Sequence, residues 1–283
     1  MNSFERGSWS VAWDLEDGGR LTALRFREQN LLTSAPLAFH PPMRDYGRFE
    51  TRPVYGYDDC FPTVDACEFP REGWAVPDHG ELCWLPWRVE VTSDELSFEV
   101  TSSKLPISFR RNLRFDASTL AWSFEAVNSS GRPIPFIHVM HCLMPLGEIV
   151  RVELPEFDKA VDEALDRPMP LRSSGEVREL LESKGASKPW MLLLQGVKSG
   201  SAGLEFRSGL KLEIRFPAAM FPTLGIWWNG GKYPDEDGCR RVECALEPIP
   251  GNYSSLARCL EEGAYLSAPP GGSVGWTITW SVS

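Results

Sequence analysis

The chain has 283 residues with a formal net charge of −10; 42% of its residues are hydrophobic and 24% are charged. These proportions are typical of a globular protein and exclude a disordered or fibrous chain, and the acidic excess argues against nucleic acid or an anionic membrane as a partner. No stretch approaches the roughly 18 apolar residues of a membrane span, and the N-terminus lacks the apolar segment of a secretory signal. We therefore expect a cytoplasmic protein whose partner is a small molecule.

The number of cysteines also favours a cytoplasmic location. Seven of them are scattered along the chain, an odd number in a protein large enough to fold without covalent cross-links. Free thiols in a reducing compartment are the expected state.

Alternation of apolar and polar residues, the period of a β-strand, dominates the pattern. In chain order it predicts a hairpin in 8–32 around Asp17-Gly18-Gly19, then strands in 87–100, 107–127, 210–216 and 274–282. Helical signal is sparse: Ser174 begins one short amphipathic segment that Gly185 ends. Runs of strands with few helices predict an all-β protein of large antiparallel sheets packed as a sandwich, with residues 1–283 in one domain.

Prolines interrupt any long strand between Ala35 and Trp87. This segment is expected to be a long ordered loop region. Such loops are often functional, so the stretches around Tyr57–Pro62 and His79-Gly80 are candidate site regions.

Acid–base chemistry by histidine has only four candidates: His40, His79, His138 and His141. The segment that holds His138 and His141 has the composition of a strand, in which residues three apart point to opposite faces. At most one of the two is expected to face a site.

A metal site would have to use the loop region, where Cys60, Cys67, His79 and Cys83 follow one another. Their spacing lacks the close ligand pairs of structural zinc sites. The interpretation as ordinary buried thiols is preferred, and no metal and no cofactor are expected.

Among the carboxylates, Glu247 is unusual because it ends an apolar strand just before Pro248-Ile249-Pro250-Gly251. By composition alone it is a structural residue at a strand end, and Asp58 and Asp59 are turn caps. Trp227 and Trp228 by themselves indicate packing.

Several short segments, in order, resemble the aldose 1-epimerase (galactose mutarotase-like) superfamily. They are Pro77-Asp78-His79-Gly80, Asn128-Ser129-Ser130 followed by Pro135-Phe136 and His141, Gly225-Ile226-Trp227-Trp228, Ala245-Leu246-Glu247-Pro248, and Pro270-Gly271-Gly272-Ser273 before Trp276. The resemblance covers essentially the whole chain and implies a galactose mutarotase-like β-supersandwich that binds a monosaccharide or a sugar phosphate in an open cleft.

The resemblance also implies roles for individual residues. Glu247 would take the proton of the anomeric hydroxyl, and a protonated His141 would donate to the ring oxygen, so that the pyranose opens and closes again as the other anomer. His79, Asp59 and Trp228 would contact the sugar through hydrogen bonds and ring stacking.

Two other functions are compatible with the same sequence. One is a carbohydrate-binding protein of this fold that binds a sugar in the cleft but does not catalyse a reaction. It is favoured because the Asn-Arg pair found early in many members of the superfamily is absent here, where Tyr57–Thr63 occupies the corresponding region. A glycoside hydrolase or lyase is the weaker alternative, because hydrolysis uses two carboxylates and only Glu247 has a supporting context.

Overall fold

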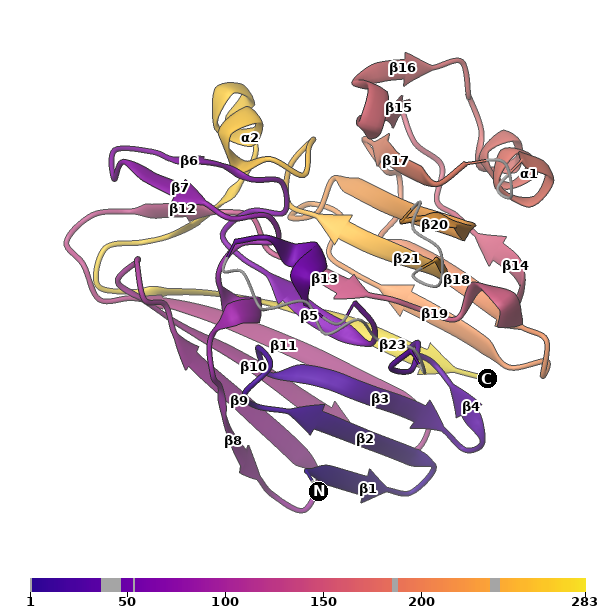
Figure 1. Ribbon diagram of the computed structural model, residues 1–283, viewed down its shortest axis with the longest axis horizontal. Helices are drawn as coiled ribbons and strands as arrows, with labels where there is room; N and C mark the ends of the chain where they lie inside the picture. Colours follow the sequence, from indigo (N-terminus) through magenta and orange to yellow (C-terminus); the bar gives the residue numbers. More distant parts are fainter. Residues whose placement is uncertain (1, 37–46, 53, 185–187, 235–239) are drawn as a thin grey trace.

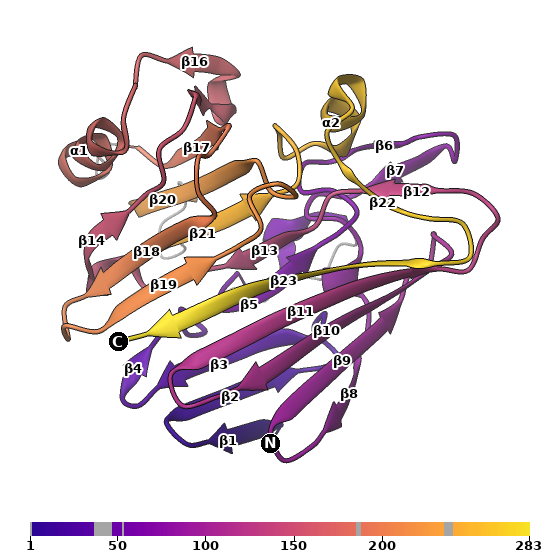
Figure 2. The same ribbon diagram turned by 180° about the vertical axis from the view of Figure 1, so that it is seen from behind.

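The computed structural model describes residues 2–36, 47–52, 54–184, 188–234 and 240–283. His40 and Cys239, two residues considered in the sequence, lie outside these ranges. Two large antiparallel layers face each other, with short hairpins and helices at one end (Figures 1 and 2).

One layer is an eight-stranded sheet in the order β14-β18-β19-β23-β11-β10-β9-β8, seen in front in Figure 2. Its strands alternate buried and partly exposed residues, as in Thr119–Asn128, because one face packs on the core and the other faces solvent. The strands are β8 Arg88–Val91, β9 Glu95–Thr101, β10 Ile107–Phe115, β11 Thr119–Asn128, β14 Ile149–Glu153, β18 Ser201–Phe206, β19 Lys211–Arg215 and β23 Ser273–Val282.

The other layer consists of two sheets placed edge to edge. The first has the order β1-β2-β3-β5-β13, with β4 beside β3, and the second has the order β16-β15-β17-β20-β21. The strands are β1 Ser3–Arg6, β2 Trp9–Asp14, β3 Arg20–Phe26, β4 Gln29–Asn30, β5 Tyr57–Cys60, β13 Val139–Cys142, β15 Lys159–Asp162, β16 Arg167–Met169, β17 Trp190–Gln195, β20 Thr223–Tyr233 and β21 Arg241–Ile249.

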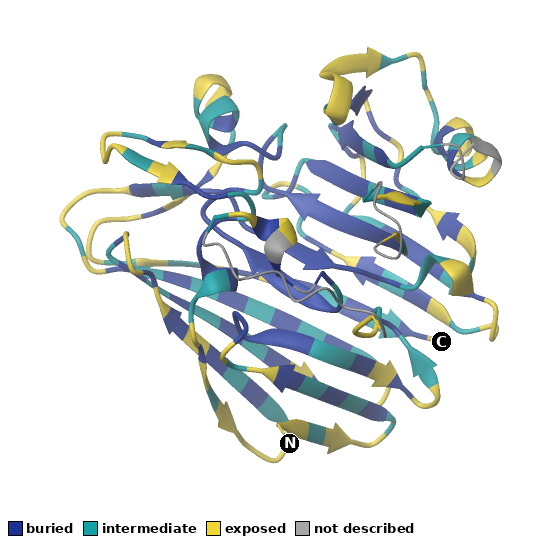
Figure 3. Ribbon diagram, viewed as in Figure 1, coloured by how far each residue is buried: buried dark blue, intermediate teal, exposed yellow. Residues whose placement is uncertain are grey.

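A backbone bridge joins these two sheets. The amides and carbonyls of Met144 and Cys244 bond each other at 2.7 and 2.9 Å, which holds the end of β13 beside β21. The strands at this seam are buried along most of their length (Figure 3). One of their faces packs on the eight-stranded sheet, and the other is covered by loops.

The remaining elements are short. They are the strand pairs β6 Cys67–Phe69 with β7 Trp74–Val76 and β12 Ile134–Phe136 with β22 Leu266–Ala268, the helices α1 Ser174–Lys184 and α2 Leu256–Glu262, and the 3₁₀ turns η1 Phe49–Thr51, η2 Leu82–Trp84, η3 Leu146–Glu148 and η4 Glu163–Leu165.

Aromatic side chains fill the space between the layers, among them Trp122 and Trp280, whose ring centroids are 5.2 Å apart. This arrangement confirms the all-β fold and the hairpin expected in 8–32, which β2 and β3 form. The alternating segments 87–100 and 107–127 each contain two paired strands, β8 with β9 and β10 with β11. The helix from Ser174 is also confirmed.

One expectation about the strands is wrong. The segment around His138 is not one strand: β12 ends at Phe136 and pairs with β22, and β13 begins at Val139 in another sheet. The six cysteines that the structure describes are free, as expected. None of the described helices is long and apolar enough to span a membrane.

Candidate functional site

A cavity of about 330 Å³ lies on the loop-covered face of the seam between β13 and β21. Its walls come from segments far apart in the sequence: the turn of η1, the loop after β7, strands β13, β20 and β21, and η4. The residues that matter for its chemistry are Glu50, Asp65, Asp78, His79, His141, Glu163, Trp227, Tyr233, Arg241, Glu243 and Glu247.

Strand alternation decides which side chains reach this cavity. On β21, Glu243 and Glu247 lie four residues apart and therefore on one face, and Ala245 between them pairs with Trp227 of β20. On β13, His141 points to the cavity while Cys142 packs into the core.

The loop histidine is held by backbone geometry. His79 adopts a left-handed φ of 62°, and its amide donates to the carbonyl of Val64 at 2.6 Å. The following Gly80 has a φ of 70°, and a Cβ atom there would lie 2.0 Å from the carbonyl oxygen of Phe61. Glycine is therefore required after His79 for the turn to approach β5.

The two cavity histidines form a small aromatic group. The ring of His79 stacks on Phe49 with centroids 3.6 Å apart, and its edge meets His141 at 4.8 Å. His141 is 9% exposed, and its Nδ1 atom has no hydrogen-bond partner among the described residues. Burial, with further contributions from the nearby His79 and arginine charges, lowers the pKa of His141 well below its ordinary value, so this imidazole is neutral at pH 7.

Glu247 is the most perturbed carboxyl group of the cavity. It is 4% exposed and has no hydrogen-bond partner among the residues that the structure describes. Burial raises its pKa to about 8, and the charge of Glu163 adds to the increase. Glu247 is therefore mostly protonated at neutral pH in the ligand-free protein.

Glu163 lies across the cavity at the start of η4. Its two carboxylate oxygens accept hydrogen bonds from the amide and the hydroxyl of Ser254 at 2.8 and 2.7 Å. Burial raises its pKa to about 7, although the bonds from Ser254 oppose this. Its only signal in the sequence is the acidic segment Asp162-Glu163, which resembles an ordinary turn, so it could not be selected before the structure was known.

An ion-pair group closes another wall. Arg241 bonds Glu243 through Nε at 2.9 Å and Glu50 through Nη1 at 3.0 Å, and the indole nitrogen of Trp227 donates to Glu243 at 3.1 Å. The guanidinium and the indole are thereby held in fixed orientations.

The structure thus brings together three of the five residues selected from the sequence: Glu247, His141 and His79. As expected, His138 and His141 point to different places. His138 is buried between the layers, where its Nε2 lies 2.9 Å from Asp59.

Asp59 and Trp228 do not line the cavity. Asp59 is fully buried between the layers, where it pairs with Arg111 of β10 and accepts from the hydroxyl of Tyr57 at 2.5 Å. Trp228 points into the core from the opposite face of β20 and is 6% exposed. The expected sugar contacts of these two residues are corrected: Trp227 holds the cavity position, and Asp59 stabilises the sandwich.

The two cavity histidines are also candidate metal ligands. Ligand atoms of Cys60, His79 and His141 all lie within 4.8 Å of one another, whereas Cys67 and Cys83 do not belong to this group. Burial, together with the charge of Glu247, raises the pKa of the Cys60 thiol well above its ordinary value. A thiol must lose its proton to bind a metal, so these groups form a poor preformed metal site.

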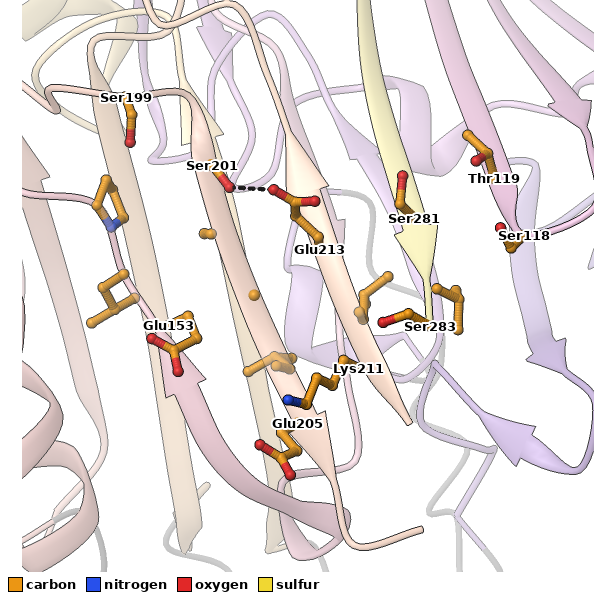
Figure 4. A pocket seen from close by; sticks show the side chains of 17 residues that line it. Ser118, Thr119, Glu153, Ser199, Ser201, Glu205, Lys211, Glu213, Ser281 and Ser283 are labelled. Atoms are coloured by element: carbon orange, nitrogen blue, oxygen red, sulfur yellow. Dashed lines mark hydrogen bonds between the residues drawn. The ribbon is translucent and has the colours of Figure 1, made fainter. Parts of the chain in front are cut away.

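A second hollow of about 720 Å³ crosses the outer face of the eight-stranded sheet (Figure 4). Its polar side chains come from neighbouring strands and include Glu153, Ser201, Glu205, Lys211 and Glu213. Ser201 donates to Glu213 at 2.9 Å, the hydrogen bond drawn in Figure 4. None of the described residues that line this hollow is a histidine, and these residues are not arranged for acid–base chemistry.

Comparison with known proteins gives a result at the level of the fold. No protein-family model matches the sequence, and no curated protein matches it. Solved structures do match: the Slr1438 protein from Synechocystis sp. PCC 6803 has a TM-score of 0.76 and 16% identity, with 100% of this chain and 95% of that chain covered.

Two further solved structures carry more informative names. A galactose mutarotase-like protein from Clostridium acetobutylicum matches with a TM-score of 0.69 and 18% identity, covering 99% of this chain and 94% of that one. A galactose mutarotase related enzyme from Lactobacillus acidophilus matches with a TM-score of 0.64 and 16% identity over 99% and 96% of the chains. The chain therefore has the galactose mutarotase-like fold, which confirms the β-supersandwich expected from its motifs.

Proposed function

We propose that the cavity binds the pyranose form of an aldose and interconverts its α and β anomers. The observation that carries this proposal is Glu247, a buried carboxyl group on the cavity wall without a hydrogen-bond partner among the described residues. A sugar hydroxyl can supply that partner. The volume of about 330 Å³ is at the lower end of small-molecule sites and suits a monosaccharide better than an oligosaccharide.

Mutarotation needs one group that accepts the proton of the anomeric hydroxyl and one that donates a proton to the ring oxygen. At neutral pH the pair of Glu247 and His141 holds a single proton, which lies on Glu247 in the ligand-free protein. The pair therefore offers one proton to donate and one basic atom to accept a proton, as mutarotation requires.

The expected roles remain those of Glu247 as base and His141 as acid, which requires the proton to move to His141 when the sugar binds. The opposite assignment uses the same proton count, so the dependence of rate on pH is the same for both. His79 would orient a sugar hydroxyl, and Trp227 would cover an apolar face of the ring.

The test is the anomeric exchange rate measured by NMR for α-glucose, α-galactose and their 6-phosphates. Wild type should accelerate exchange of at least one of these sugars, and Glu247→Gln and His141→Asn should lose this acceleration with unchanged circular dichroism. Wild type that accelerates none of them would contradict the proposal.

A second candidate function is carbohydrate binding without catalysis. It is favoured by the protonation states of the two residues. In the ligand-free protein Glu247 is protonated and His141 is neutral, whereas the family resemblance implies an ionised Glu247 as base and a protonated His141 as acid. Sugar binding without acceleration in the same NMR samples would support this function. The cytoplasmic location and the single domain stay predictions from the sequence.

A further inference from the structure

The walls of the cavity carry an unequal set of charges. Among its described lining residues are six carboxyl groups and only one arginine or lysine, which is Arg241. The carboxyl groups belong to Glu50, Asp65, Asp78, Glu163, Glu243 and Glu247.

The single guanidinium is already engaged. Arg241 pairs with both Glu243 and Glu50, at 2.9 and 3.0 Å, so no arginine or lysine among the described lining residues is left vacant for a phosphate. Arg258 does not line the cavity, although its charge favours the ionised forms of Glu163 and Asp65. Its guanidinium donates to Asp166 at 2.8 Å.

The uncompensated acids surround the group that lacks a partner. Glu247 is more than nine-tenths buried, has no hydrogen-bond donor among the described residues and feels the charge of Glu163 across the cavity. Glu163 in turn feels Asp65. A ligand that donates hydrogen bonds and carries positive charge would satisfy the buried carboxyl group and relieve the repulsion among these acids.

We propose that this cavity binds an aldose carrying an ammonium group in preference to its neutral counterpart and rejects sugar phosphates, an inference that rests on the proposed sugar site. The ammonium group donates to the carboxylate of Glu163 or Asp65. A phosphate would lie among these carboxylates, with no vacant cation among the lining residues that the structure describes, and the repulsion excludes it.

Three 1,5-anhydro sugars test the proposal: 1,5-anhydroglucitol, its 2-amino-2-deoxy derivative and its 6-phosphate. They keep the pyranose ring but cannot open it, so calorimetric titration at pH 7 measures binding apart from catalysis. We expect the amino sugar to bind about tenfold more tightly than the neutral sugar, the effect of one charge-assisted hydrogen bond, and the phosphate not to bind. The preference should shrink as salt is added.

Glu163→Gln should reduce the ratio of the amino-sugar affinity to the neutral-sugar affinity to about twofold or less. Asp65→Asn, at the exposed rim, is the second variant if the first fails to fold, and Glu205→Gln in the outer hollow is the matched control that keeps the preference. Equal affinities for the neutral and amino sugars, tightest binding of the phosphate, or binding of none of the three would overturn the proposal. Anomeric exchange of glucose is measured separately, so a charge preference without exchange contradicts only the mutarotase function.

Discussion

The cavity at the seam and the hollow on the outer sheet face differ in how their polar groups are held. The outer hollow is about 720 Å³ and the cavity about 330 Å³. In the hollow, polar side chains lie on neighbouring strands and satisfy one another in solvent, as Ser201 and Glu213 do. In the cavity, groups from distant segments converge, and neither the Nδ1 atom of His141 nor the carboxyl group of Glu247, both buried, has a hydrogen-bond partner among the described residues.

The comparison shows that convergence and incomplete hydrogen bonding mark the candidate site better than volume does. Burial shifts the pKa values of Glu247 and His141 toward the neutral form of each group, and such groups gain most from a ligand that supplies the missing hydrogen-bond partner. Each prediction below compares a residue of the cavity with a matched one elsewhere.

The largest effect is expected from Glu247→Gln, which should lower the anomeric exchange rate by about 10² to 10⁴ because it removes the proton-transferring group. Its control is Glu213→Gln in the outer hollow, for which the rate should stay within about twofold of wild type, because surface substitutions of this kind have small effects. NMR measurements of anomeric exchange with both variants check this. An equal loss of rate in the two variants would contradict the assignment of the reaction to the cavity.

Asp59→Ala should lower the free energy of unfolding by about 3–5 kcal/mol, because it leaves Arg111 buried and unpaired between the layers. The pKa of Asp59 is lowered, since the charge of Arg111 and the hydrogen bonds with His138 and Tyr57 outweigh the effect of burial. Urea denaturation checks the value. The control is Asp78→Ala at the partly exposed cavity wall, and a comparable loss there would contradict the assignment of Asp59 to the structural core.

The pH dependence of kcat/KM follows from the shared proton of Glu247 and His141. Because the pKa of Glu247 is raised to about 8, the pair keeps its proton at neutral pH and loses it as the pH rises through that value. We expect kcat/KM to fall about tenfold per pH unit above about pH 8. Measurements from pH 5 to 10 check this. A profile that rises through pH 8 instead would mean that the fully deprotonated pair is the active form.

The smallest effect separates the two adjacent tryptophans. Trp227→Leu should raise KM by about three- to tenfold, as expected for the loss of one aromatic contact, with a small change in thermal stability. Trp228→Leu should lower thermal stability and leave KM near the wild-type value, because Trp228 packs in the core. Steady-state kinetics and thermal melting of both variants check this, and a larger KM change for Trp228 would reverse the assignment.

The alternation of residues was enough to predict the strand content, because a sheet with one buried face imposes a period of two on its sequence. The hairpin turns were equally local, since Gly18 and Gly19 have positive φ angles. The prediction that one strand runs through His138 and His141 was wrong, because Ile134–Phe136 and Val139–Cys142 belong to different sheets. Pairing between distant segments leaves no local pattern in the sequence.

The all-β class, the helix at Ser174 and, through short motifs, the cavity residues Glu247, His141 and His79 could be predicted from local sequence. The choice between Trp227 and Trp228, and the place of Asp59 in the core and not in the cavity, came from the packing of the two layers. In both cases neighbouring residues of one strand point to opposite faces, and the sequence of that strand does not say which face meets the other layer. The register with distant strands sets this, as when Trp227 pairs with Ala245 beside Glu247. Glu163 reaches the same cavity for a similar reason, because the sandwich brings η4 to the seam.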